Sequence, residues 1–286
     1  YVLSEMRAAK SMQGEEASRE FDDALTSHIG HTLSNGVRAV VHGLTRSMFA
    51  RAPLGAAPET RHYFRHLTRL SAAFAFLADV SMLAMGGALK RKEKISGRLG
   101  DVLSMMYLVS ATLKHYEDQG RLKADLPLVR WAVRDALYSA QQAIDQVLSN
   151  FPVKALATVL RWTIFPLGMP FRPPLDSRNH ECARIALEPG AARDRLTAGI
   201  YLPKGEADAT AVLEAAFLAA VACEPIDKKL REAVKAGALE PRSGVDTAQL
   251  ARERDIISAE EYAQWQRKES LRKHVIMVDD FPQDFD

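Results

Sequence analysis

Apolar residues recur every third or fourth position along four long stretches between Glu16 and Asn150. This spacing gathers apolar side chains on one side of an α-helix, whereas a half-buried strand needs strict alternation. Alternating β-branched runs bounded by turns are almost absent from the chain. The pattern therefore predicts an all-α fold: an antiparallel bundle of long helices followed by a smaller helical subdomain.

The bundle is predicted to contain helices at 16–47, 60–89, 95–116 and 125–150. A linker with two prolines and a glycine, "ARAPLGAAP" at 50–58, separates the first two helices. After residue 150 the composition of the sequence changes, which predicts two domains, 1–150 and 151–286. Prolines 152 and 166 bracket a short helix in the second domain, and further helices are expected at 178–187, 209–222, 226–236 and 258–273.

Four of the five residues from Lys90 to Lys94 are basic, which by itself could mark a nucleic-acid patch. The whole chain of 286 residues, however, carries 38 basic and 36 acidic side chains, a balance unlike that of dedicated nucleic-acid binders. The cluster also lies between two helical patterns. We therefore expect a solvated helix–helix corner and no nucleic-acid partner, with a nucleic-acid binder kept as a rival hypothesis.

The two cysteines, Cys182 and Cys223, lie far apart and have no CxxC companion. This spacing argues against a disulfide framework and a zinc site, and favours buried thiols in a reducing compartment. The first residues, "YVLSEMRAAK", resemble neither a signal nor a transit peptide, and no apolar run is expected to span a bilayer. The predicted location is the cytoplasm, with peripheral attachment to the inner face of the cytoplasmic membrane as a further expectation.

No P-loop, dinucleotide fingerprint, HExxH or GxSxG motif is present. The pairs His28/His31 and His62/His66 have helical spacing that could suit a metal. Only Glu59, at the linker end of its helix, could join either pair, so hydrogen-bonded or helix-edge histidines are the favoured interpretation. No catalytic, cofactor-binding or metal-ligating residue is predicted.

Asp79 lies inside the apolar run "FAFLADVSMLAM" and should need a partner, because burying an unpaired carboxylate is costly. The predicted partners come from neighbouring helices. The candidate structural ion-pair network is Asp79, Arg98, Asp101 and Arg134, with Arg130 and Asp135 as further candidates. A catalytic pair of carboxylates is the alternative.

The segment Phe151–Pro174 contains no acidic residue. In its helical pattern, apolar residues share one face and Lys154 and Arg161 the other, as in helices that lie on membrane surfaces. The candidate membrane or partner contacts are Lys154, Arg161, Trp162 and Phe165. An ordinary amphipathic helix packed on the bundle is the alternative.

Four stretches resemble one family along nearly the whole chain: "SHIGHTLSNGVRA" (27–39), "HYFRHLTRLSAAFAFLADVSMLAMGGALKRKEKISGRLGDVLS" (62–104), "FPLGMPFRPP" (165–174) and "AARDRLTAGIYLP" (191–203). They are similar to the C-terminal extension of bacterial-type fatty acyl-CoA dehydrogenases. The likeness is weakest from Gly237 onward.

The resemblance implies a full-length enzyme that oxidises a fatty acyl-CoA to the trans-2-enoyl-CoA in β-oxidation. Its FAD would be held by an upstream flavoprotein core, and its electrons would pass to an electron-transfer flavoprotein. In the family a glutamate followed by glycine removes the α-proton; Glu5 has no glycine after it and does not match. The chain is therefore expected to start downstream of that base and to bind no flavin.

The resemblance further implies that the chain serves as an oligomer interface, as a cover for the acyl channel or as a membrane dock, since long-chain relatives with such extensions associate with membranes. A homo-oligomer is expected. The alternative is a stand-alone helical adaptor or membrane-surface module without enzymatic activity.

Overall fold

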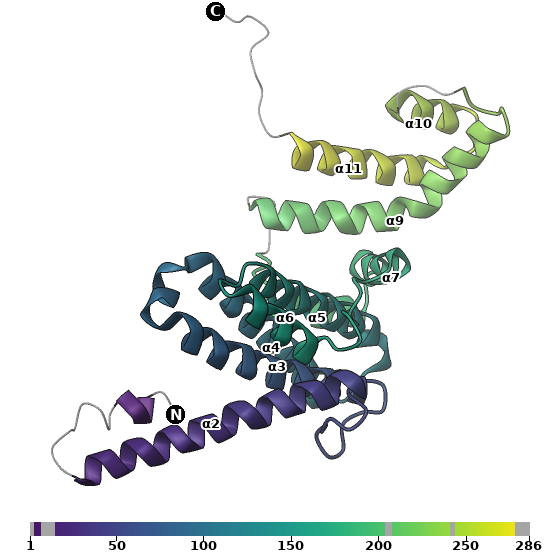
Figure 1. Cartoon of the computed structure of the whole chain (residues 1–286). Helices are drawn as coiled ribbons and strands as arrows, with labels where there is room; N and C mark the ends of the chain where they lie inside the picture. The colour runs from purple at the N-terminus through teal and green to yellow at the C-terminus, as the bar shows by residue number, and fades with distance from the viewer. Residues whose placement is uncertain (1–2, 7–14, 204–207, 241–243, 278–286) are drawn as a thin grey trace, which may run out of the picture. The chain divides into compact units, whose positions relative to one another are not determined.

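The computed structural model describes residues 3–6, 15–203, 208–240 and 244–277. These residues form helices joined by turns, and no strand occurs among them, which confirms the predicted all-α fold (Figure 1). Contacts divide the chain into two compact units, Tyr1–Ala183 and Arg184–Asp286. The prediction that residues 1–150 and 151–286 form separate domains concerns independent folding, and it stays a prediction.

Among the described residues, the first unit contains a helical turn at 3–6, five whole α-helices, the first part of a sixth (α7) and two short 3₁₀ turns. Their bounds are α2 Glu15–Leu44, α3 Arg61–Met85, η1 Gly86–Arg91, α4 Glu93–Asp118, η2 Lys123–Asp125, α5 Leu126–Ser149, α6 Lys154–Ile164 and α7 Asp176–Leu187. The four predicted bundle helices therefore correspond to α2, α3 with η1, α4 and α5.

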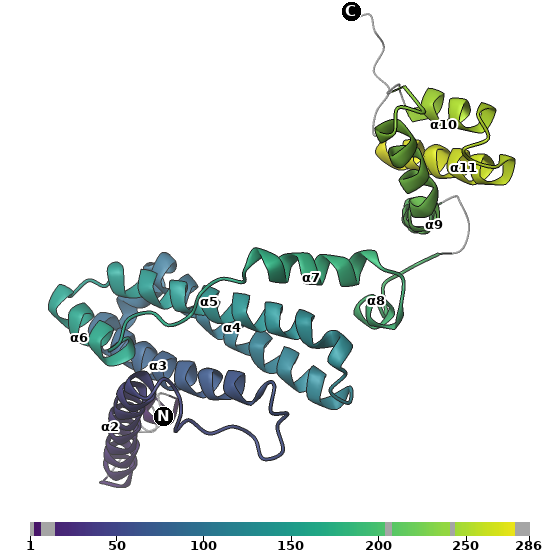
Figure 2. The ribbon, with the colours of Figure 1, turned by 90° about the vertical axis from the view of Figure 1, so that its right-hand side faces the viewer.

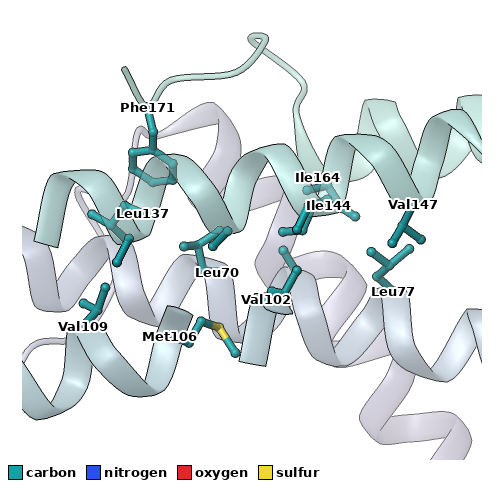
Figure 3. Packing of buried hydrophobic residues seen from close by; sticks show 14 of the residues in the cluster. Leu70, Leu77, Val102, Met106, Val109, Leu137, Ile144, Val147, Ile164 and Phe171 are labelled. Carbon is teal, nitrogen blue, oxygen red and sulfur yellow. The ribbon is translucent and has the colours of Figure 1, made fainter. Parts of the chain in front are cut away.

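The core of the first unit lies where α3, α4, α5 and α6 meet (Figure 3). Leu77 of α3, Val102 of α4 and Ile144 of α5 are fully buried there. Leu160 and Ile164 close the core from α6, so this short helix is part of the bundle. Phe171, from the extended segment after α6, packs beside Leu137 at one end of the core.

Small and polar residues, rather than its apolar residues, bring α2 against the rest of the unit. The buried positions of α2 are Asn35, Gly36, Ala39, His42 and Gly43. A methyl group added at Gly36 would lie 3.1 Å from Phe76 of α3, and one at Gly43 only 2.6 Å from Pro166 beyond α6. The absence of a side chain at these two glycines therefore permits the close approach of the helix.

The basic cluster falls on η1 and the first turn of α4, where residues 90–94 are all exposed. Gly86 has φ = 50°, a left-handed conformation that glycine adopts without steric cost. The chain thus leaves α3 at Gly86 and turns through η1 into α4. The prediction of a solvated helix–helix corner is confirmed.

After α6, an extended segment crosses the unit and leads into α7, which lies alongside α5 (Figure 2). Trp131 on α5 donates a hydrogen bond from Nε1 to Asn179 Oδ1 at 2.6 Å. The half-buried thiol of Cys182 lies 3.6 Å from the carbonyl oxygen of Pro127. These contacts attach the first half of α7 to the first unit.

The second unit contains α8 Ala191–Leu196, α9 Ala209–Lys235, α10 Gly244–Glu253 and α11 Ala259–Ile276. Its core surrounds Cys223, Ile226 and Leu230 of α9 and Trp265 of α11. A capping box between Ser258 and Glu261 begins α11, which corresponds to the helix expected at 258–273. The helix α10 was not expected from the sequence.

The predicted separation between helices 209–222 and 226–236 is wrong, because α9 runs through it as one helix with Pro225 inside. Proline removes one helical hydrogen bond and crowds the preceding turn. Here two nearby residues, Cys223 and Ile226, are buried in the core that α9 shares with α11. Burial of these side chains offsets the cost of an internal proline.

Candidate functional site

An exposed apolar stripe on α2 is the most unusual surface of the first unit. Its six members follow one another at steps of three or four residues and are 38–64% exposed. They are Leu25, Ile29, Leu33, Val37, Val41 and Leu44, which we call the α2 stripe. Beyond the helix, Met48 and Phe49 are 67% and 73% exposed. Contiguous apolar surface of this kind marks interaction sites on soluble proteins.

A groove of about 260 Å³ lies between α2 and α3, next to this stripe. Its apolar walls are Leu25, Ile29, Leu33, Val80 and Leu83. Three polar residues, His28, Thr32 and Asp79, complete its lining. The groove therefore combines apolar walls with one small polar patch, as sites for amphipathic groups do.

Asp79 is bonded within this patch. Its Oδ2 accepts a hydrogen bond from Thr32 Oγ1 at 2.8 Å, and its Oδ1 lies 3.4 Å from His28 Nε2. The other ring nitrogen of His28, Nδ1, lies 2.8 Å from Glu5 Oε1. The imidazole thus bridges two carboxylates, and the patch ties α2 to α3 and to the turn at 3–6.

The predicted network of Asp79 with Arg98, Asp101 and Arg134 is not formed among the residues that the structure describes. Arg98 instead donates from Nε to Gln146 Oε1 at 3.0 Å, and Asp101 is exposed. Two residues correspond to about 200° around a helix. Since Leu77 faces the core, Asp79 must face away from α4 and α5 and toward α2.

The histidine pairs serve as hydrogen-bonding and lining residues. His31 Nε2 lies 2.8 Å from Asn35 Nδ2, one turn later on α2. His62 and His66 line a second cavity, between α3 and α5. Within the described ranges, no group of three or more His, Cys, Asp or Glu side chains could hold a metal ion.

The four residues predicted on the basic helix have different environments. Arg161 forms an ion pair with Asp145, and Lys154 Nζ donates to the carbonyl oxygen of Ser149 at 2.9 Å. Trp162 is 69% exposed, as a surface contact requires. Phe165 is only 6% exposed and packs in the core, so its prediction as a surface residue is wrong. It follows the last residue of α6, where the chain turns back over the bundle.

Two helical segments, Arg61–Arg91 and Ala209–Lys235, are long and apolar enough to cross a membrane by length and composition alone. This corrects the expectation that no run reaches that length. Core helices of soluble proteins pass the same test, and α3 buries Leu70 and Leu77 in the first unit.

Three cavities lined by described residues are each too small for a large cofactor. Their volumes are about 230, 260 and 290 Å³. Pockets for drug-sized ligands typically measure about 300–1,000 Å³, and a flavin dinucleotide is larger than such ligands. No residue described here is therefore assigned to FAD, and no chemical step is derived through it.

The sequence matches a known family along nearly the whole chain. The sequence model of the family described as "Acyl-CoA dehydrogenase, C-terminal, bacterial type" matches residues 1–281. No solved structure matches the chain. The family match confirms the resemblance that the four quoted stretches indicated.

Proposed function

The chain belongs to the bacterial-type C-terminal family of acyl-CoA dehydrogenases, and from this premise we propose that it is the part of such an enzyme that docks on the catalytic core. The full-length enzyme would be an oxidoreductase that converts a fatty acyl-CoA to the trans-2-enoyl-CoA in β-oxidation. FAD and the catalytic base would belong to the core, and an electron-transfer flavoprotein would accept the electrons. A homo-oligomer is part of the proposal.

The α2 stripe is the observation that carries this proposal. Its six apolar side chains would each gain on the order of 1–3 kcal/mol from full burial. The buried face of α2 is already occupied by contacts of small and polar residues with α3 and α6. The stripe therefore remains available for another surface, and the rest of the dehydrogenase is the occupant that the family membership favours.

The test is to express the catalytic core and residues 1–286 as two polypeptides and to measure their association by sedimentation. We expect Leu33→Asp to weaken association by about tenfold or more, because a carboxylate replaces an apolar contact in the interface. Leu103→Asp is the matched control, since Leu103 is 55% exposed on α4, away from the stripe.

Equal affinities of the two variants would contradict docking through α2. Self-association of residues 1–286 that Leu33→Asp abolishes, without any binding to the core, would favour the stand-alone adaptor instead.

A membrane dock on α6 is a second candidate, favoured by the exposure of Trp162 (69%) and Val159 (60%). An exposed tryptophan on a helix that also carries a lysine suits the interfacial region of a bilayer. In this proposal the enzyme is cytoplasmic and attaches to the inner face of the cytoplasmic membrane.

Co-sedimentation with anionic vesicles at low salt tests the membrane dock. We expect Trp162→Ser and Lys154→Glu to reduce the bound fraction. Tyr107→Ser, at a 72% exposed site on α4, should leave it unchanged. Absence of binding at low salt, where electrostatic attraction is strongest, would reject this candidate.

A further inference from the structure

A second cavity of the first unit, of about 230 Å³, is lined by basic side chains from three segments. His62 and His66 come from α3, Arg134 comes from α5, and Arg172 comes from the extended segment after α6. Tyr63 adds a hydroxyl group. No carboxylate is among the residues that line the cavity.

Positive charge in this cavity is not compensated by the described residues. Neither Arg134 nor Arg172 forms an ion pair or hydrogen bond within the described part of the chain. Burial and the nearby guanidinium groups of Arg130 and Arg134 lower the pKa of His62. The guanidinium groups of Arg130 and Arg134 therefore lie close enough to His62 to disfavour its protonation.

A buried arginine lies close to His66, one of the residues that line the cavity. Arg69 is 4% exposed, and its Nη2 donates to the carbonyl oxygen of Ile164 at 3.3 Å. Burial lowers the pKa of Arg69 to about 10. Burial, followed by the neighbouring His62 and Arg69, lowers the pKa of His66 to about 4. Arg69 is buried and Arg134 is half-buried, and no carboxylate lines the cavity. An anion that entered the cavity would therefore offset the cost of keeping these two cations partly out of water.

The lining is held in place before any ligand binds. The amide of Gln141 donates to the carbonyl oxygen of Phe171 at 3.0 Å and accepts from the Phe171 N–H at 2.9 Å. The Phe171 ring contacts the ring of His66 edge-to-face, with centroids 5.2 Å apart. The backbone next to Arg172 is therefore held in place, while the Arg172 side chain itself is exposed. A ligand would not have to pay for ordering this backbone.

We propose that this cavity binds a phosphate group. Arginine presents planar N–H donors that match the oxygens of a phosphate, and two arginines from different segments can contact it from two sides. The imidazoles of His62 and His66 and the hydroxyl of Tyr63 would supply neutral hydrogen bonds. The phosphate could be free, or part of a nucleotide or lipid headgroup. This inference does not depend on docking through α2.

The test is calorimetric titration of inorganic phosphate into residues 1–286 at low ionic strength. We expect saturable binding that Arg134→Gln and Arg172→Gln each weaken by about tenfold, because a charge-assisted hydrogen bond is lost. The matched control is Arg98→Gln, which removes a half-buried arginine that is hydrogen-bonded to Gln146 and does not line the cavity. Circular dichroism checks that each variant is folded. If Arg134→Gln does not fold, the phosphate affinity of Arg172→Gln alone tests the proposal.

Competition experiments identify the source of the phosphate. Displacement by coenzyme A but not by its 3′-dephospho form assigns a nucleotide phosphate monoester. Displacement by vesicles containing phosphatidic acid, but not by phosphatidylcholine vesicles, assigns a lipid headgroup. Displacement by neither assigns free phosphate. The proposal is overturned if wild-type protein shows no saturable phosphate binding, or if Arg98→Gln weakens it as much as Arg172→Gln.

Discussion

At the residue scale, Gln141 shows how one buried polar side chain positions a distant segment. It is 1% exposed, yet both atoms of its amide bond the backbone of Phe171. Sequence analysis did not single it out, because glutamine in the run "SAQQAIDQV" looks like an ordinary polar helix position. Its partner is a backbone group far along the chain, which spacing within one helix cannot reveal.

We expect Gln141→Leu to lower the free energy of unfolding by about 1–3 kcal/mol, because it leaves the N–H and C=O of Phe171 without partners. Urea denaturation followed by circular dichroism measures the change. Gln146→Leu is the control, since Gln146 is exposed on the same helix. Equal losses of unfolding free energy for the two variants would contradict the role of Gln141 in holding the Phe171 backbone.

His66 predicts a dependence of stability on pH. Burial and its neighbours His62 and Arg69 lower its pKa from 6.5 to about 4 in the folded protein. Between these values the unfolded chain binds a proton that the folded protein does not, so stability falls as the pH falls through this window. The loss from pH 7 to pH 5 is expected to be up to about 2 kcal/mol.

Urea denaturation at both pH values checks this expectation. His66→Gln should reduce the difference between them, whereas His115→Gln, at an exposed position, should not. A pH dependence that is the same in all three proteins would exclude His66 as its source.

At the element scale, the apolar pattern predicted where helices lie better than which faces they bury. The expected helix at 16–47 corresponds to Glu15–Leu44, and the expected bundle helices all exist. The α2 stripe, however, is exposed, because contacts through Gly36 and Gly43 determine how α2 packs. Periodicity identifies an apolar face, but what covers that face depends on tertiary contacts.

The packing of α2 predicts opposite effects for two glycines on the same helix. Gly43→Ala would place a methyl group 2.6 Å from Pro166 and should cost about 1–3 kcal/mol of stability. Gly30→Ala meets no atom within 4 Å and should be neutral or stabilising by up to about 1 kcal/mol, through helix propensity. Thermal unfolding compares the two. A stabilising Gly43→Ala would show that the close approach is not required.

At the scale of the whole molecule, the quoted stretches sufficed to identify the family, while the division of the chain depends on packing. The change in composition predicted a boundary after residue 150, just before Pro152. Leu160 and Ile164 lie beyond that boundary but are 0% and 1% exposed in the core of the first unit. The composition of the sequence therefore changes at residue 150, although the core of the first unit continues beyond it.

This arrangement predicts different behaviour for two truncations. Residues 1–187, which include α6 and α7, should unfold cooperatively in urea. Residues 1–150 should be less stable by several kcal/mol or should aggregate, because the core side of α3 and α5 loses its cover. Equal stability of the two truncations would instead support independent folding of residues 1–150.

The contact between Gly43 and Pro166 also bears on how this sequence can evolve. A position on α2 and one just after α6 share a space in which only one side chain fits. A larger residue at 43 can be accepted only if the chain near 166 becomes smaller or moves. The two positions are therefore expected to covary among homologous sequences, so that this steric constraint would leave a record in the family's history.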